Sequence, residues 1–241
     1  MKNNWFVTGD IHGNISRLWN IKRSNLIPKD SNLIVLGDFG ANFYLNDKDN
    51  QFKNVCEKLN ITFYAVRGNH EQRPELIDGM KLVYDELVKG DVYFQPKWPH
   101  IKYFKNWGIY QINNYKIAII GGAYSIDKHY RLAKGWTWFS TEQLTIEERE
   151  QCKQKLQNQK VDFVFTHTAP RSLEPTDLFM PIVDQSTVDK SMEDFLEEIK
   201  NCLNWKIWLF GHYHHDRIEI NCVEQFYQNI ENIEEIWQRW N

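Results

Sequence analysis

Five short apolar runs along the chain each lead into a turn that presents Asp, Asn or His. The runs are Trp5–Thr8, Leu33–Leu36, Thr62–Val66, Val161–Phe165 and Ile207–Phe210. Apolar runs of strand length are typical of strands buried on both faces in an α/β fold. The polar residues that follow them are Asp10 and His12, Asp38, Asn69 and His70, His167, and His212 and His214. Because ligand sites in such folds lie outside the carboxyl ends of the strands, these side chains are predicted to converge.

The segments between these runs predict the other elements of one α/β domain, spanning residues 1–241. Helices are expected at Ile15–Lys22, Asp47–Leu59, Thr141–Gln157 and Val188–Leu203. Strand, loop, helix and strand at this spacing indicate parallel βαβ units. The middle of the chain holds short runs separated by turn residues, at Val92–Gln95, Tyr103–Phe104, Gly108–Ile112 and Tyr115–Ile120. With a hairpin turn expected at Asn113 and Asn114, these runs predict an antiparallel section and a mixed second sheet.

The C-terminal segment Glu231–Asn241 has the pattern of an amphipathic helix. Its apolar residues are Ile233, Ile236, Trp237 and Trp240. Such a helix packs either on its own domain or on a partner, and the sequence leaves both arrangements open.

Charge and cysteine content narrow the partners and the location. The formal net charge is −3, so no global positive field attracts extended nucleic acid or an anionic membrane. The scattered cysteines contain no CxxC pair, which argues against a zinc ribbon and fits reduced thiols. The N-terminus has no apolar signal-peptide region, and no apolar stretch reaches the roughly 18 residues of a membrane span. A cytoplasmic soluble protein is therefore expected.

The predicted cluster has the composition of a metal site. A lone His or Asp after a strand is usually a structural residue or a helix cap. A whole set at one edge is hard to explain as packing, because buried charges are costly unless they are paired or metal-bound. Carboxylates and imidazoles without cysteine indicate borderline divalent metals: manganese first, with iron, zinc, nickel or cobalt as alternatives. Two such ions joined by a bridging carboxylate suit in-line displacement at phosphorus, with a bound water turned into hydroxide.

The motifs resemble those of the calcineurin-like metallophosphoesterases. The matching blocks are Asp10-x-His12, Gly37-Asp38, Gly68-Asn69-His70-Glu71, His167 and Gly211-His212-x-His214, all in the family's order. The resemblance implies a four-layered α/β/β/α sandwich of two mixed sheets, with a dimetal site at the carboxyl-terminal edge of the strands. It also implies that Asp10, His12 and His214 hold one metal, that Asn69, His167 and His212 hold the other, and that Asp38 bridges them. His70 would be the general acid beside the leaving group and would not bind metal.

Departures from the family pattern bear on the substrate. The protein Ser/Thr phosphatases and the symmetrical dinucleotide tetraphosphatases continue the Gly-Asp block into Asp-Arg-Gly, whereas this chain has Ala41-Asn42-Phe43 nearby. The small phosphodiesterases with Cys in place of the catalytic His are excluded by His70. Arg131 is a candidate for the missing phosphate clamp, with Lys128 as a second candidate. Both lie in a block similar to uncharacterised bacterial and phage members, followed by Trp136 and Trp138, which either pack in the wall or stack on a base.

The resulting hypothesis is hydrolysis of a phosphomonoester or a phosphodiester in a small molecule, a nucleotide or a nucleic-acid end. The acidic composition argues against a processive nuclease, because such enzymes carry a basic track. The alternative is a non-catalytic interaction scaffold of the same fold. Scaffolds tend to lose ligands or the catalytic His, and this chain has all of them.

Overall fold

In the computed structural model, which describes residues 4–218 and 221–241, two β-sheets form the centre of the molecule. The strands of the first sheet lie in the order β13 (Ile230–Asn232), β1 (Trp5–Thr8), β2 (Ser31–Val35), β3 (Ile61–Ala65), β6 (Trp98–Phe104), β5 (Gly90–Gln95), β4 (Lys81–Asp85). Strands β1, β2, β3 and β6 pair in parallel, and β13, β5 and β4 are antiparallel to their neighbours. The first sheet is therefore mixed.

The second sheet is mixed as well. Its strands lie in the order β11 (Arg217–Ile218), β12 (Val223–Gln225), β10 (Ile207–Phe210), β9 (Phe163–Thr166), β8 (Tyr115–Ile120), β7 (Trp107–Ile112). The four inner strands pair in parallel, and β7 and β8 form the antiparallel hairpin that was predicted around Asn113. The predicted runs at 92–95 and 103–104 fall in the first sheet, because β5 and β6 pair with each other next to β3.

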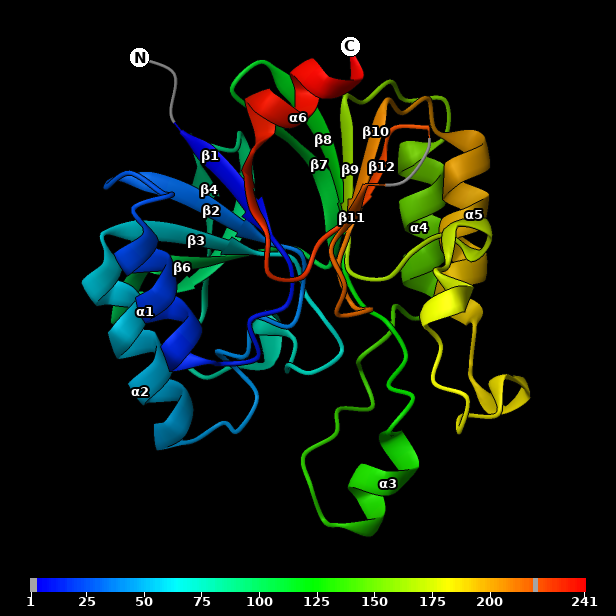
Figure 1. Cartoon of the computed structure of the whole chain (residues 1–241), viewed down its shortest axis with the longest axis horizontal. Helices are drawn as coiled ribbons and strands as arrows, with labels where there is room; N and C mark the ends of the chain where they lie inside the picture. Colours follow the sequence, from blue (N-terminus) through cyan, green and yellow to red (C-terminus); the bar gives the residue numbers. More distant parts are fainter. Residues whose placement is uncertain (1–3, 219–220) are drawn as a thin grey trace.

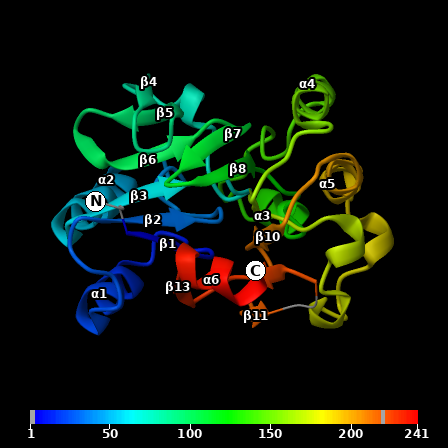
Figure 2. The ribbon, with the colours of Figure 1, turned by 90° about the horizontal axis from the view of Figure 1, so that it is seen from above.

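Helices cover the outer face of each sheet, as Figures 1 and 2 show. The helices α1 (Ile15–Ser24) and α2 (Asp47–Cys56) lie on the first sheet, and α4 (Ile146–Leu156) and α5 (Ser191–Cys202) lie on the second. Three apolar clusters fill the spaces between layers, and the middle one joins residues of both sheets, such as Val7 and Phe165. The predicted α/β fold with two mixed sheets is confirmed, and the helices on the outer faces agree with the predicted α/β/β/α layering. Short 3₁₀ turns occur at Glu57–Leu59, Pro74–Leu76, Arg171–Leu173, Thr176–Leu178 and Gln185–Thr187.

Capping explains one wrong boundary. The helix predicted from Thr141 begins at Ile146, because Thr145 caps it in a capping box with Glu148. The helix predicted from Val188 likewise begins later, at Ser191. The sequence patterns also missed β4, β11, β12 and the short helix α3 (Lys128–Ala133). These elements have only two to six residues, too few for a periodic pattern to emerge.

The C-terminal helix packs on its own domain. This helix, α6 (Ile233–Trp240), follows β13 and buries Ile233 and Ile236 completely in the cluster between the sheets. The Trp237 ring lies 4.9 Å from the ring of Tyr115 and 5.7 Å from that of Phe163, between centroids. Of the two predicted arrangements, packing on the same domain is therefore observed.

The strand topology gathers the predicted site at one end of the molecule. In Figure 1 the carboxyl ends of the inner parallel strands point toward α3, while both chain termini lie at the opposite end. The segment that carries α3 extends beyond the sheets on that side. Within the described residues, no helix has the length and apolar character needed to cross a bilayer.

Candidate metal centre

Asp10, His12 and His214 form a first group of converging donors. Nε2 of His12 lies 2.8 Å from Nε2 of His214, and the two nitrogens lie 3.6 and 3.3 Å from Oδ2 of Asp10. That carboxylate oxygen is buried and has no conventional hydrogen-bond partner. Burial disfavours the charged carboxylate, but the neighbouring imidazoles of His12 and His214 outweigh it and hold the pKa of Asp10 below its usual range. Two imidazole nitrogens and an ionised oxygen aimed at one point fit a divalent cation.

Backbone conformation places these donors. His12, Asp38, His212 and His214 all have φ between 46° and 69°, the left-handed region that side chains other than glycine rarely adopt. The loop after β1 is held against the loop after β2, because the backbone carbonyl of Asp38 accepts from the amides of Ile11 and His12 at 3.0 and 2.7 Å. Such conformations cluster at functional sites, where the surrounding structure maintains the strain.

A second group lies deeper, around His167. Its Nε2 is 2.8 Å from Oδ1 of Asn69, and its Nδ1 lies 2.8 Å from the carbonyl of Leu36. Donation to that carbonyl from Nδ1 leaves Nε2 as the atom that can bind a metal. Burial opposes a charge on His167, but Asp38 and Asp10 outweigh it and raise the pKa of His167 to about 9, so a metal ion that binds Nε2 must displace a proton.

His212 completes the second group. Its ring centroid lies 4.9 Å from that of His167, and its backbone N–H donates to Oδ1 of Asp10 at 2.9 Å. Burial and the charge of His167 lower the pKa of His212 to about 3, so its imidazole is neutral and able to bind a metal.

Asp38 lies between the two groups. Its Oδ1 is 3.5 Å from Nε2 of His167, its Oδ2 is 3.9 Å from Nδ1 of His12, and it accepts the backbone N–H of His70 at 2.8 Å. Gly68 is needed for this approach, because a Cβ there would meet Oδ1 of Asp38 at 2.0 Å. Every predicted metal ligand is thus brought to one edge of the fold.

Ser125 and Glu142 fix the amide of Asn69, and sequence reasoning missed both. The side-chain amide of Asn69 donates to Oγ of Ser125 at 2.8 Å, and Ser125 donates to Oε2 of Glu142 at 2.5 Å. Trp138, which was expected to pack or to stack on a base, donates from its indole to the same carboxylate oxygen at 2.9 Å. The burial of these residues has no local sequence signal, since it depends on where the loop after β8 lies.

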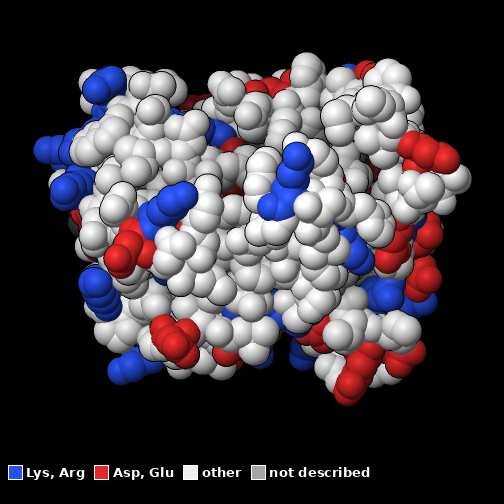
Figure 3. All heavy atoms as spheres, turned by 90° about the horizontal axis from the view of Figure 1, so that it is seen from below, with Lys and Arg blue, Asp and Glu red and all other residues white. Residues whose placement is uncertain are grey.

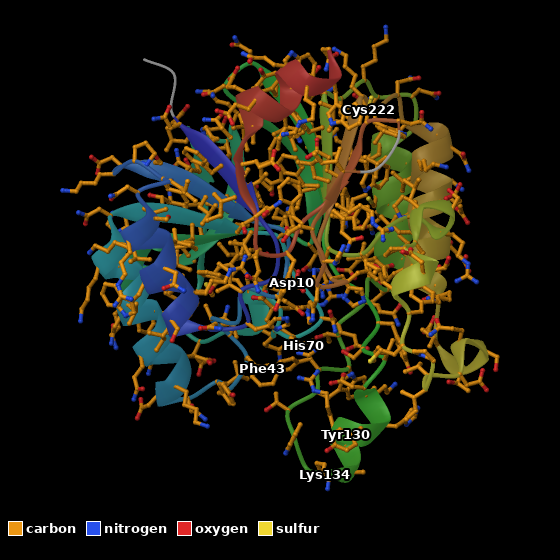
Figure 4. The ribbon with its side chains drawn as sticks, viewed as in Figure 1. Asp10, Phe43, His70, Tyr130, Lys134 and Cys222 are labelled. Carbon is orange, nitrogen blue, oxygen red and sulfur yellow. The ribbon has the colours of Figure 1, made fainter. Side chains whose placement is uncertain are left out.

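His70 lies at the edge of this cluster, beside α3 (Figure 4). Its ring stacks on Phe43 with centroids 6.1 Å apart and planes 19° apart. Its Nδ1 lies 3.4 Å from Nη2 of Arg131. Burial, with the Arg131 charge in support, outweighs the attraction of Asp38 and lowers the pKa of His70. One ring nitrogen of His70 also falls within 4.8 Å of donor atoms of His12 and Asp38.

The two predicted phosphate-binding cations occupy different places. Arg131 is only 2% exposed, its guanidinium carbon lies 5.1 Å from the centroid of Phe43, and its Nη1 has no hydrogen-bond partner. The ammonium of Lys128 instead lies 4.3 Å from the centroid of Trp138. Among the described residues, the linings of the two cavities next to His70 include Arg131 and not Lys128.

Comparison with known proteins gives the family. The sequence profile described as calcineurin-like phosphoesterase matches residues 6–216. No curated protein is significantly similar to the chain. A phosphopantetheinyl hydrolase from Mycobacterium tuberculosis has 15% identity over 99% of this chain and 92% of its own, with a TM-score of 0.50. A protein of unknown function from Aquifex aeolicus has 14% identity over 99% of this chain and 100% of its own, with a TM-score of 0.49. On the profile match, the chain belongs to the calcineurin-like phosphoesterase family and is a hydrolase of phosphate esters.

Proposed function

We propose that the protein hydrolyses a phosphate ester at a centre of two divalent metal ions. The observation that carries this proposal is the pair of donor groups joined by Asp38. In the first group, Oδ2 of Asp10 is buried, has no conventional hydrogen-bond partner and faces the imidazole nitrogens of His12 and His214. In the second, Nε2 of His167 and Oδ1 of Asn69 lie 2.8 Å apart.

Each residue then has a role. Asp10, His12 and His214 would hold one ion, and Asn69, His167 and His212 the other, with Asp38 shared between them. Two bound ions would neutralise the phosphate oxygens and make water a stronger nucleophile. The mixture of carboxylate, amide and imidazole donors favours manganese, with iron, zinc, nickel or cobalt as alternatives.

His70 acts on the leaving group. A water oxygen attacks phosphorus, the P–O ester bond breaks, and the departing oxygen takes a proton from His70. The lowered pKa of His70 in the free protein works against this role, because the donor must be protonated. The negative charge of a bound phosphate favours the protonated imidazole and offsets that effect.

Arg131 grips the phosphate. Its buried Nη1 has no partner, and its Nη2 lies 3.4 Å from His70, so an anion beside His70 would supply the missing acceptor. The geometry supports Lys128 less as a phosphate-binding residue, because its ammonium lies over the ring of Trp138.

The substrate we propose is a phosphorylated small molecule or nucleotide. The Mycobacterium tuberculosis structure of similar fold is named a phosphopantetheinyl hydrolase, so this fold accommodates such compounds. Extended nucleic acid is disfavoured, because the Lys and Arg side chains on the face shown in Figure 3 are scattered and do not form a continuous band. The four cysteines are free thiols, which supports the reducing cytoplasm as the location.

Hydrolysis is favoured over the non-catalytic scaffold because all ligands and His70 are present and brought together. The test is turnover of p-nitrophenyl phosphate and bis-p-nitrophenyl phosphate by protein stripped with chelator and reloaded with Mn²⁺. We expect turnover to return with about two ions per chain by elemental analysis. Two bound ions without turnover of either compound would favour the scaffold.

A further inference from the structure

Two cavities meet at His70. The first, of about 440 Å³, opens onto the metal centre, and its lining includes Asp38, Asn69 and His212. The second, of about 550 Å³, lies on the side of Phe43 and Arg131. His70 and Asp127 line both cavities and form the boundary between them.

The outer wall of the first cavity is apolar. It comprises Ile126, Leu178, Phe179, Met180 and Val188. The Phe179 ring stacks on Tyr213, with centroids 6.2 Å apart and planes 19° apart, and the Lys190 ammonium covers it at 4.7 Å. Lys190 is itself paired with Glu174 at 2.5 Å, so its charge is compensated. This wall is suited to an uncharged apolar group.

The second cavity is aromatic, and its charged lining residues include two cations, Lys48 and Arg131, and one carboxylate, Asp127, which lies 3.8 Å from Nε of Arg131. Phe43, Tyr44 and Trp136 contribute rings, and Trp136 is oriented by an edge contact with Tyr130 at 5.6 Å between centroids. The Lys48 ammonium lies 4.5 Å from the centroid of Tyr44, and Arg131 supplies the unpartnered Nη1. Rings and cations together suit a planar, electron-rich group such as a nucleobase.

We propose that the substrate is a phosphodiester whose phosphate lies at the junction beside His70, with one alcohol in each cavity. A phosphomonoester has one organic substituent and would leave one of the two cavities empty. A diester has two substituents diverging from phosphorus, and it fills both. This inference rests on the proposed function, because it requires the phosphate to bind at the metal centre.

The reaction balances as a hydrolysis. Water adds across one P–O bond, the new P–O bond retains the water oxygen, and His70 supplies the proton that the departing alkoxide takes up. The products are an alcohol and a phosphomonoester, and the proton released by water restores His70. No oxidant or further reactant is required.

The test compares matched substrates on the Mn²⁺-loaded full chain. The probes are bis-p-nitrophenyl phosphate, p-nitrophenyl phosphate and the p-nitrophenyl ester of thymidine 5′-phosphate. Met180→Ala removes an apolar side chain from the lining of the first cavity. Trp136→Ala removes an aromatic ring from the lining of the second. Both side chains are at least half exposed, so neither change removes a core contact. Ile182→Ala and Leu132→Ala are the controls, because these exposed side chains lie in the same two segments and outside both linings.

We expect Met180→Ala and Trp136→Ala each to lower kcat/KM for the two diesters about 5-fold or more. For p-nitrophenyl phosphate, which has one organic group, we expect a comparable loss in at most one of the two variants. The controls should change neither. Diester hydrolysis that is unaffected by one of the cavity variants would overturn the inference, as would hydrolysis of the monoester alone. In both cases the proposed phosphoesterase function would stand. Turnover of none of the three probes by the metal-loaded protein would overturn that function as well.

Discussion

The side-chain amide of Asn69 donates to Oγ of Ser125 at 2.8 Å, which turns its oxygen toward His167. An amide has a donating and an accepting end of nearly the same shape, and only the oxygen can bind a metal. The Ser125 hydroxyl donates to Oε2 of Glu142 at 2.5 Å, and Oε1 of Glu142 accepts the Ser125 backbone N–H at 3.2 Å. This buried chain decides which end of Asn69 faces the site.

The first prediction concerns that chain. Ser125→Ala should leave the nitrogen of Asn69 without its acceptor and allow the amide to rotate, which weakens the second metal. We expect about a 10- to 100-fold loss of affinity at one of two sites, as for other outer-shell partners of metal ligands. Titration with Mn²⁺ followed by elemental analysis measures the affinity of each metal site. Ser172→Ala, on the surface by α5, is the control. Two ions bound with unchanged affinity in Ser125→Ala would contradict the role given to this chain.

The second prediction distinguishes two roles for His70, general acid and metal ligand. One of its nitrogens lies near donor atoms of His12 and Asp38, so distance alone allows it to be a ligand. If His70 is the general acid, His70→Ala should lower kcat by about 10²- to 10⁴-fold and leave two ions bound. Elemental analysis beside steady-state kinetics distinguishes the cases. Loss of an ion in the variant would make His70 a ligand.

The third prediction compares two cations on one short helix. Arg131→Ala should raise KM or lower kcat/KM about 10-fold or more, because the substrate phosphate loses the buried guanidinium beside His70. Arg131→Lys keeps the charge and loses the two-pronged geometry, so it should recover only part of the activity. Lys128→Ala is the matched control and should change little. Thermal unfolding of each variant shows whether Arg131→Ala acts through stability, and equal losses for Arg131 and Lys128 would contradict the assignment.

The layers and the convergence of the site were predictable because they follow from short-range patterns. An apolar run followed by a polar turn residue identifies a strand end, and parallel topology then brings such ends together. The side chains that surround His70 could not be predicted from such short-range patterns. Phe43 comes from the loop before α2, Arg131 comes from the six-residue helix α3 after β8, and Asp127 precedes that helix as its N-cap residue. These side chains surround His70 in a chain whose sequence lacks the Asp-Arg-Gly block. Only the path of the loop that carries α3 reveals this.

The last prediction concerns stability and pH. Glu193, in the first turn of α5, is buried, and its Oε1 accepts from Oγ1 of Thr168 at 2.8 Å while its Oε2 has no hydrogen-bond partner. Burial raises the pKa of Glu193 from 4.5 to about 7. The folded protein therefore binds this proton more tightly than the unfolded chain does. The stability that the proton contributes is fully present below pH 4.5 and is lost as the pH rises to about 7.

Glu193→Gln places a permanently neutral group at this position. The variant should therefore gain stability relative to the wild type as the pH rises from about 5 to 7, by up to about 3 kcal/mol. Urea unfolding of both proteins at several pH values, without metal, gives the difference directly and cancels the other titrating groups. Asp194→Asn, an exposed neighbour on α5, should follow the wild type across the range. A Glu193→Gln curve parallel to that of the wild type would show that Glu193 ionises in the folded protein as easily as in the unfolded chain.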